Sequence, residues 1–442
     1  MILPTEILKG MVDDVISIKQ SNTISIKMMI RNHQDPKFDI DDASIDIMEY
    51  EQNFMSNTTD NINISVNMTP QQVQKLVNFQ SDLFADIIFE YVDTTTGEVV
   101  LEEKPIRKQY KVLVHDLSSI AKKYGITAFE APEGSDTISG TPSSTFIKVE
   151  MQLITDNEYK INRASFVGMM KDVTVDDAIK YMASVMGIKS IKMVPSDNPT
   201  KYQHLSIPPD KGGFRAAFDY LQNTYGVYTN GFRHYITNGV LYVYPPFDMK
   251  AERSPKLHVI RVSENSYGGS QNYHRVEDSK DLTIVSNSKL HSQTLSNIGS
   301  ENEGNAKLFS RSDGVIDGQV KSSDMSLNNI TASMSGKADS TIVKGSAVAK
   351  YVKPTMNLLN HASIFSESNT EMMVFGWSNA RIEMIYPGMP TVFIFDEKKA
   401  VMSKTGVVES AKYSITRSSK KVFICNAVLT VRSDPKAVPY SA

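Results

Sequence analysis

Eight histidines are the side chains of this chain that could most readily bind a metal or transfer a proton. They are scattered along the sequence as His33, His115, His204, His234, His258, His274, His291 and His361. No two of them have the His-x-x-x-His spacing of a helical zinc site, and none has a glutamate at ligand spacing. The spacing predicts no metal site, so any such site would have to be assembled by the fold.

Carboxylates cluster between residues 35 and 51. The cluster consists of Asp35, Asp39, Asp41, Asp42, Asp46, Glu49 and Glu51. A calcium loop or a glycosidase carboxylate pair would use such residues. However, the Asp-x-Asp-x-Asp-Gly order is absent, and spacing within a β region does not fix the distance between two carboxyl groups. We therefore interpret the cluster as a solvated or channel-facing acidic loop.

Three further motifs have structural explanations. Lys211-Gly212-Gly213 precedes a predicted helix but lacks the spacing and the Lys-Ser/Thr of a phosphate-binding loop, so it is expected to be a helix entry turn. Ser333 and Ser335 lie outside any Gly-x-Ser-x-Gly elbow. Cys425 is the only cysteine, which excludes an intrachain disulfide and favours a small buried residue in a strand. The sequence thus predicts no catalytic, cofactor-binding or metal-binding residue, and no cofactor.

The elements that would position any site begin with a helix-hairpin module in residues 205–244. Large apolar side chains recur at helical spacing from Phe214 to Tyr225, and Gly226 ends the helix where a left-handed residue is needed. Asn230-Gly231 and Asn238-Gly239 then predict hairpin turns. The module is typical of packing and contains no recognisable catalytic group.

The chain has 442 residues, so two to four domains are expected. Its net charge of −3 gives no basic field of the kind that duplex binding requires, and this disfavours nucleic-acid recognition as the main activity. The first residues lack the basic and apolar regions of a signal peptide. No apolar run approaches the roughly 18 residues of a membrane-spanning helix, so no membrane anchor is expected.

Residues 1–116 are predicted to form a first β-barrel domain, because apolar and polar residues alternate over several short runs. Thr69-Pro70-Gln71-Gln72 predicts the start of one helix within it, with a capping box and proline at the first position. Residues 117–250 are predicted to be an α+β insert domain that contains a helix from Val175, capped by Thr174, to Gly187. Pro132–Ser144 is expected to be an exposed loop.

A second barrel is predicted to start in residues 251–285 and to be completed by residues 341–442. Between them, residues 286–340 are rich in Ser, Asn, Gly, Asp and Lys and cannot bury enough apolar surface to order themselves alone. They form either a flexible insertion or an arm that becomes ordered against another subunit. The predicted fold class is β-rich α+β and multidomain, with two barrels, an insert and a polar extended segment.

The order of these pieces resembles the baseplate hub proteins of contractile-tailed phages, a family that includes phage late control proteins and the hub of type VI secretion spikes. The resemblance rests on the module with Phe214–Gln222, on Tyr386–Pro390 before a strand and on the closing strand Asn426–Val431. It covers residues 1–290 and 345–435. The segment from Ser286 to Ser340 departs from the family pattern, which does not require it.

This resemblance implies two tail-tube-like barrels in each chain, so that a homotrimer presents six barrels as a ring. Such a hub would connect the sixfold tail tube, or a tube initiator, to the threefold central spike. It would enclose a channel for the tape measure protein and for DNA in transit, and the acidic cluster could then line this bore. The family has no catalytic residues to transfer to this chain. The resemblance also implies a virion component of the baseplate that is assembled in the host cytoplasm.

Two other functions remain open from the sequence. A cell-wall-degrading or carbohydrate-binding tail module would need paired carboxylates in a cleft or an aromatic platform, and no motif predicts either one. A hub of a tailocin or secretion spike would follow the same structural principles and would differ only in the assembly to which it belongs.

Overall fold

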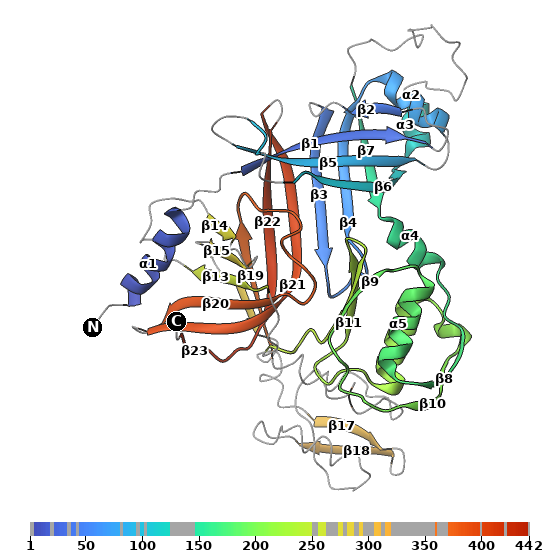
Figure 1. The fold of residues 1–442 in the computed structure, drawn as a ribbon, viewed down its shortest axis with the longest axis vertical. Coiled ribbons are helices and arrows are strands. Elements are labelled where there is room, and N and C mark those ends of the chain that lie inside the picture. The colour runs from blue at the N-terminus through green and yellow to red at the C-terminus, as the bar shows by residue number, and fades with distance from the viewer. Residues whose placement is uncertain are drawn as a thin grey trace.

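Figure 1 shows the fold of the chain in a computed structural model. The structure describes residues 4–17, 22–32, 37–40, 44–79, 83–93, 98–100, 104–123, 146–249, 255–261, 273–276, 281–286, 291–294, 305–310, 314–319, 359, 370–397, 400–419 and 422–440. Strands dominate these residues, and the prediction of a β-rich, multidomain α+β fold is confirmed. Among the helices in these ranges, none is both long and apolar enough to cross a bilayer.

One sheet of 16 strands runs through most of the molecule. Its first part, which we call the first unit, contains β1 (Asn22–Arg31), β2 (Lys37–Ile40), β3 (Ile45–Asn53), β4 (Asn61–Met68), β5 (Phe84–Asp93), β6 (Ile106–Val114) and β7 (Ile147–Ile154). The strands of this unit are paired in the order β3-β4-β7-β6-β5-β1, with β2 beside β1. All of these pairs are antiparallel.

The remaining strands of this sheet form the second unit. They are β13 (Leu257–Arg261), β14 (Tyr273–Val276), β15 (Leu282–Ser286), β16 (His291–Thr294), β19 (Glu371–Trp377), β20 (Pro390–Glu397), β21 (Ala400–Ser419), β22 (Val422–Ser433) and β23 (Val438–Pro439). The order β15-β13-β20-β21 continues through β22 and β19 to β16. The Ser286 hydroxyl at the end of β15 donates to the Gly376 carbonyl of β19, so this sheet curls back on itself.

The two units share one strand path. In the first unit the path β5-β6-β7-β4-β3 is antiparallel throughout, and in the second unit the path β20-β21-β22-β19-β16 is antiparallel throughout. The strands of the two paths occur in the same relative order in the sequence. Each path continues to a sixth strand, which is β1 beside β5 in the first unit and β13 beside β20 in the second. These sixth strands differ in direction, because β1 is antiparallel to β5 whereas β13 is parallel to β20. The units are therefore related in topology, with one strand reversed.

Strands β21 and β22 belong to both units. The first half of β21 pairs with β20, and residues from Ser410 to Thr416 pair with β3 instead. β22 pairs with β21 along its length and touches β1 at Ile24. These contacts close the first unit into a ring of eight strands, made of its own six and the two shared ones. Figure 1 shows β21 and β22 running from one unit into the other.

Alternation of side chains produces a single core inside both units. Along β3 the buried positions include Met48, Tyr50 and Gln52, while the intervening residues are partly exposed. The core continues into the second unit through residues such as Trp377 and Leu429. Burying one face of each strand in this way fixes the register, because a slip by one residue would turn the polar face inward.

Helices cover the two units differently. α2 (Pro70–Phe79) follows β4 and packs Val73 and Leu76 into the core of the first unit, near α3 (Leu117–Lys123). The predicted capping box at Thr69 is present, since the Thr69 N–H donates to Gln72 Oε1 and the Gln72 N–H donates to Thr69 Oγ1. The second unit is covered instead by α1 (Pro4–Ser17), from the start of the chain, in a small core with Ile260.

The insert, residues 155–249, has its own core and follows β7 directly. It contains α4 (Asp156–Arg163), α5 (Val175–Val185) and α6 (Phe214–Tyr220), the last extended by a wide turn, Leu221–Tyr225. One sheet pairs β8 (Gly168–Val173) with β10 (Tyr202–Ile207). The other has the order β11 (Arg233–Thr237), β12 (Val240–Tyr244), β9 (Ser190–Met193). Gly226 has φ +79°, the left-handed residue that the sequence requires after the helix.

Three features differ from the predicted domain ranges. α1 lies within residues 1–116 but packs on the second unit, and β7 lies within residues 117–250 but belongs to the sheet of the first unit. The C-terminal strands contribute to both units. Within the polar segment, β17 (Asn305–Ser310) and β18 (Gly314–Gln319) form a hairpin. The predicted loop Pro132–Ser144 lies outside the described residues.

Candidate functional site

The histidines are placed apart from one another. His115, His204, His234 and His258 are described with their side chains, His274 and His291 only by their backbone, and His33 and His361 lie outside the described residues. Within the described part of the chain, no group of three or more His, Cys, Asp and Glu side chains could hold a metal ion. His234 is buried among Phe214, Phe218 and Phe232. Burial is the main cause that lowers the pKa of His234 to about 3, so it is neutral at pH 7.

The other predicted candidates also separate. Asp35, Asp41, Asp42, Ser333 and Ser335 lie outside the described residues. Asp39 is on β2, and Asp46, Glu49 and Glu51 are on β3, where Glu49 and Glu51 share the outward face. Cys425 is buried on β22, and burial raises its pKa.

The Lys211-Gly212-Gly213 motif forms a helix entry. Pro209–Lys211 is one short helical turn, and Gly213 is the residue before α6. A Cβ atom at Gly212 would lie 2.5 Å from Val167 Cγ2. The glycine is therefore explained by close packing rather than by phosphate binding.

The structure brings a different carboxylate, Asp60, to the place where the parts of the molecule meet. It lies between β3 and β4 and is 4% exposed. Its Oδ2 accepts hydrogen bonds from Tyr50 Oη at 2.9 Å and Thr237 Oγ1 at 2.9 Å. Its Oδ1 accepts from Tyr235 Oη at 3.0 Å and Gln52 Nε2 at 3.2 Å. Two of these donors belong to the first unit and two to the insert.

The backbone reinforces this contact. Thr59 forms a parallel bridge with Ile236, and the Ile236 N–H donates to the Thr58 carbonyl at 2.8 Å. Arg215 Nη1 on α6 donates to the Ser56 carbonyl at 3.1 Å. The β3–β4 connection is thus a docking loop for the insert, held by both main-chain and side-chain bonds.

A cation extends the network into the second unit. Lys108 on β6 is 13% exposed and pairs with Glu383 at 2.5 Å, in the connection between β19 and β20. The Lys108 ammonium also lies 5.3 Å from the centre of the Tyr50 ring. Glu383 has φ +72°, a conformation that costs a non-glycine residue free energy and is retained only where the surroundings require it. Three parts of the molecule therefore meet in one buried network.

Burial dominates the electrostatics of this network. It raises the pKa of Asp60, while Lys108 and the hydrogen bonds from Thr237, Tyr50 and Gln52 oppose that rise. Burial and the nearby Asp60 charge also raise the pKa of Tyr50 and Tyr235 far above the usual value, so both phenols stay protonated and act as donors. Removing one partner from such a network leaves desolvated groups without bonds.

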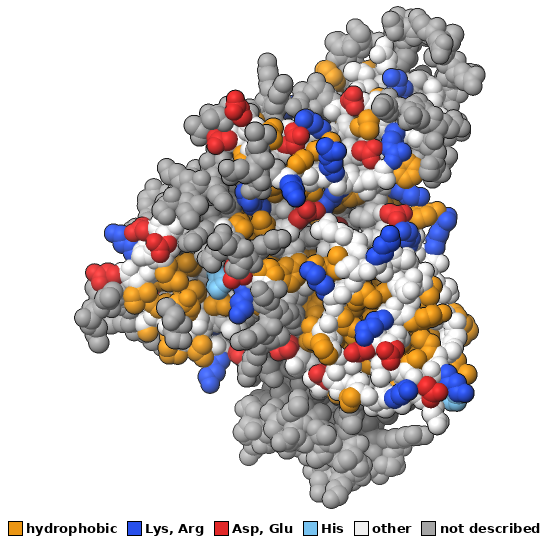
Figure 2. Space-filling view, in the orientation of Figure 1, with side chains coloured by type: hydrophobic (Ala, Val, Ile, Leu, Met, Phe, Trp, Pro, Cys, Tyr) orange, Lys and Arg blue, Asp and Glu red, His pale blue; other side chains and the backbone are white. Residues whose placement is uncertain are grey.

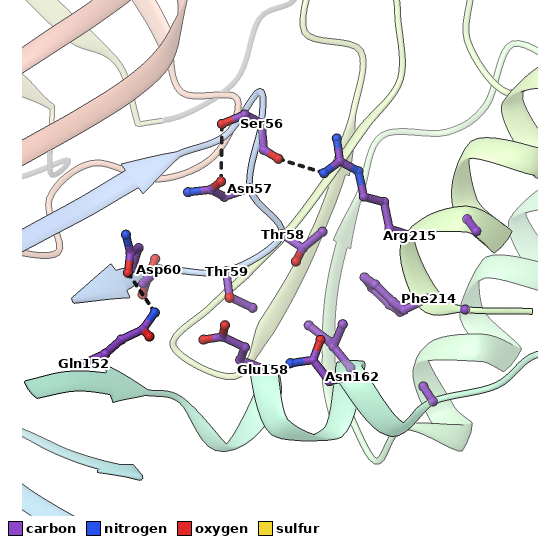
Figure 3. Close-up of a pocket in the computed structure, with 15 residues that line it drawn as sticks. Ser56, Asn57, Thr58, Thr59, Asp60, Gln152, Glu158, Asn162, Phe214 and Arg215 are labelled. Carbon is purple, nitrogen blue, oxygen red and sulfur yellow. Dashed lines mark hydrogen bonds between the residues drawn. The ribbon is translucent and has the colours of Figure 1, made fainter. Parts of the chain in front are cut away.

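A polar cavity of about 520 Å³ opens beside the docking loop (Figure 3). Residues of the loop, of β7, of α4 and of the start of α6 line it, among them Asn57, Asn61, Gln152, Glu158, Asn162 and Arg215. Burial raises the pKa of Glu158, a hydrogen bond with Thr59 opposes the rise, and Asp60 adds to it. Both oxygens of Asp60 are already engaged in hydrogen bonds, so it is not available as the second carboxylate of a hydrolytic pair.

A second junction joins the two units at the bulge in β21. Glu409 is the residue at which β21 changes from the second unit to the first. Its carbonyl accepts from the Phe54 N–H at 3.0 Å. Its carboxylate accepts two hydrogen bonds from Arg432, from Nη2 to Oε1 at 2.8 Å and from Nε to Oε2 at 3.2 Å. Arg432 Nη1 donates to Thr370 Oγ1. This paired geometry is the specific form of an Arg–carboxylate contact.

Sequence reasoning missed Asp60, and one signal could have revealed it. Along β3 the inward positions run Met48, Tyr50, Gln52, so a polar amide occupies a core position of an otherwise apolar pattern. Such a residue requires a buried partner. Asp60 is the first carboxylate that follows Gln52 in the chain. The partners from the insert could not be inferred, because nothing in the sequence pairs residue 60 with residues 235 and 237.

A model of the family described as the bacteriophage PBS1 gene 109 protein matches residues 11–299. No curated protein gives a significant match.

Several solved structures are similar to this chain at low sequence identity. A tail protein from Neisseria meningitidis MC58 is 10% identical, with a TM-score of 0.46, over 93% of this chain and 97% of that one. The 43 kDa tail protein of prophage MuSo2 from Shewanella oneidensis is 10% identical, with a TM-score of 0.44, over 92% and 96%. An Escherichia coli component of the type VI secretion system is 10% identical, with a TM-score of 0.41, over 94% and 77%.

Proposed function

We propose that this chain, which belongs to the family of the bacteriophage PBS1 gene 109 protein, is a structural protein of a phage tail, the hub of its baseplate. In this role a homotrimer joins the sixfold tail tube to the threefold central spike. It encloses a channel for the tape measure protein and for DNA in transit. The chain is then a virion component, assembled in the host cytoplasm, and has no enzymatic activity.

The observation that carries this proposal is the shared strand path of the two units. Three copies of a chain with two related units supply six similar β-sheet units. A threefold ring can match a sixfold tube in this way. The shared strands β21 and β22 hold the two units of one chain at a fixed spacing, since they pair within both. A connector needs such rigidity between its parts.

The buried network supports a mechanical role rather than a catalytic one. Every carboxylate oxygen of Asp60 is used to hold the insert on the first unit, and Lys108 with Glu383 links the same place to the second unit. A group that acts as a general acid or base needs access to its substrate. Asp60 has almost none.

Two measurements test the proposal. Gold-labelled antibody against this chain should mark the baseplate end of purified virions in electron micrographs. Electron cryomicroscopy of the purified chain should give a threefold ring with an open axial channel. Absence of the chain from the virion would rule out the proposed function. A closed, monomeric particle that releases sugars from cell walls through the Glu158 cavity would favour the enzyme instead.

A further inference from the structure

A row of alternating cations and aromatic rings crosses the outer face of the first unit. Arg31 on β1 is opposite Phe84 on β5, and Phe84 is opposite Lys111 on β6. The Arg31 guanidinium lies 5.4 Å from the centre of the Phe84 ring, and the Lys111 ammonium lies 5.6 Å from it. These three side chains share the face that points away from the core.

The row continues onto the insert through α4. The Lys111 ammonium also lies 3.5 Å from the centre of the Tyr159 ring, and the Arg163 guanidinium lies 4.3 Å from the same ring. Arg107 is exposed on the same outward face of β6. Cation–ring contacts of this kind hold long basic side chains in place.

This surface, which we call the basic wall, has excess positive charge. Its cations are Lys27, Arg31, Arg107, Lys111 and Arg163, and its acids are Asp86 and Glu90. Glu90 pairs with Lys27 at 2.8 Å and Asp86 with Arg31 at 2.9 Å, and among the described residues Arg107, Lys111 and Arg163 have no ion-pair partner. The chain as a whole has a net charge of −3, so a local excess of cations is not a property of the whole chain. Over the region that β1, β5, β6 and α4 occupy in Figure 1, Figure 2 shows Lys and Arg side chains with Asp and Glu side chains among them.

The basic wall runs from β1, which neighbours the shared strand β22, across β5 to β6. In the ring β21-β3-β4-β7-β6-β5-β1-β22, strands β7 and β6 are the middle members of the path from β21 to β22. The second unit is attached at β21 and β22. The part of the wall on β6 therefore lies on the side of the first unit that faces away from the second unit of its own chain.

The second unit presents acidic charge on α1. α1 covers the outer side of β13, β15 and β20, burying Leu8, Val12 and Val15 against it. In the second unit, β20, β13, β15 and β14 follow one another along the path that leaves the shared strand β21. The outward face of α1 exposes Glu6, Asp13 and Asp14, with Lys9 as its one cation. Figure 2 shows acidic side chains at the edge where Figure 1 places α1.

We propose that copies of this chain associate head to tail, with the basic wall of one copy docked on the acidic face of α1 of the next. The two surfaces differ from each other, so their contact is heterologous, and a heterologous contact that closes produces a ring. The opposite charges of the basic wall and of α1 set the orientation of neighbouring copies. Contact between two basic walls, or between two acidic faces, is disfavoured by repulsion. This inference rests on the proposed function for its ring and adds the surfaces that build it.

Nucleic acid is a poorer fit to the same wall. Single strands bind through bases stacked on open aromatic faces. Here cations lie over Phe84 and Tyr159, so their faces are already occupied. Duplex binding depends on many phosphate contacts, and this wall offers few cations. An acidic protein surface of similar size matches it better.

Charge reversal of the full chain tests the contact. The variant R107E/R163E changes two exposed cations of the wall, and D13K/D14K changes two exposed acids of α1. A matched control, K180E/K189E, reverses two exposed cations of the insert away from the wall. Oligomer mass is measured by mass photometry and sedimentation at about 0.05 M and about 0.5 M salt, because exposed charges are screened at the higher value. Thermal melting confirms that each variant is folded.

We expect the wild type and the control to form the same oligomer at low salt. Each reversal alone should weaken self-association by about tenfold or more, and the combination of both reversals should restore it. The proposal is wrong if single reversals leave association unchanged, if the combination does not restore it, or if the wild type is monomeric at every concentration and salt. Loss of DNA binding in R107E/R163E without a change in oligomer mass would assign the wall to nucleic acid. Labelling of virions tests the hub role separately, so a ring built through other surfaces would overturn only this inference.

Discussion

The first and second units follow the same antiparallel path through five strands but place their long connections differently. In the first unit the connection from β3 to β4 is short, residues 54–60, and docks the insert. The equivalent connection of the second unit, from β16 to β19, spans residues 295–370. Conversely, β6 and β7 are joined through residues 115–146, whereas β21 and β22 are joined by two residues, 420 and 421.

This difference shows which unit depends on the other. The tight turn lets β21 and β22 run on as long paired strands, and their far halves complete the ring of the first unit. The first unit therefore needs the end of the chain, although its own strands come first. In return, α1 from the start of the chain covers the second unit. Each unit is completed by a segment distant in sequence.

Replacing Asp60 by alanine should have the largest effect, because only the first unit carries this docking carboxylate. Four donors, two of them in the insert, would lose their acceptor inside the protein. Breaking a buried charged network in this way costs about 3–5 kcal/mol. Unfolding in urea should show this loss, and hydrogen exchange should rise first in β11 and the docking loop.

The exposed Asp210 provides the matched control, because its change to alanine should alter the free energy of unfolding by less than about 0.5 kcal/mol. Equal destabilisation by the two substitutions would contradict the assigned role of Asp60.

Local structure was predictable from the sequence where residues within a single helix or strand determine it. The capping box at Thr69, the helix ended by Gly187, and strands such as Thr391–Phe395 follow from short-range patterns. The parallel pairing of β13 with β20 and the course of β21 through both units were not predictable, because alternation does not identify a strand's neighbours. α1 was missed as well, since its apolar stripe lies in a region read as strands and is stabilised only by the second unit.

Acid should loosen the insert before it loosens the second unit. His234 has a pKa of about 3 in the folded insert, well below the ordinary value of 6.5, chiefly because it is buried. As pH falls below 6.5 the unfolded chain takes up the proton first, so stability is lost between pH 6.5 and 3, by about 3 kcal/mol at pH 4. The change His234→Gln should remove this part of the pH dependence. Urea unfolding followed from pH 7 to pH 4 measures it, and parallel curves for both proteins would refute the assignment.

Leu8→Ala tests whether the second unit depends on α1. Leu8 is 6% exposed and packs against the outer side of that unit. The truncation should cost about 2–3 kcal/mol. Hydrogen exchange should rise in α1 and in β13, β15 and β20 while β5 and β6 stay protected. The exposed neighbour Ile7 offers a control, as Ile7→Ala should be nearly neutral. Uniform loss of protection in both units would mean that they are not separable in this way.

Gly406→Ala examines the strand that crosses between the units. A Cβ at this position would lie 2.5 Å from the Arg432 carbonyl oxygen, a backbone atom that cannot easily move. Forcing apart β21 and β22 there should cost about 1–3 kcal/mol. Both units should be destabilised together, since the two strands serve both. Gly239→Ala is unsuitable as a control because of its φ of +74°, whereas Gly10→Ala meets no atom within 4 Å and should be tolerated. A melting temperature unchanged in Gly406→Ala would argue against the tight crossing.

Thr69→Ala should have the smallest effect and should be confined to the first unit. The substitution removes the acceptor for the Gln72 N–H at the start of α2, and a lost cap of this kind costs about 1 kcal/mol. Because α2 follows β4 and packs only into the first unit, protection from exchange should fall in α2 and β4 and not in β19 or β20. Thr69→Ser keeps the hydroxyl and should restore most of the loss. If protection also fell in the second unit, the common core of the two units would transmit even a small local change. The conclusion that α2 stabilises only the first unit would then be wrong.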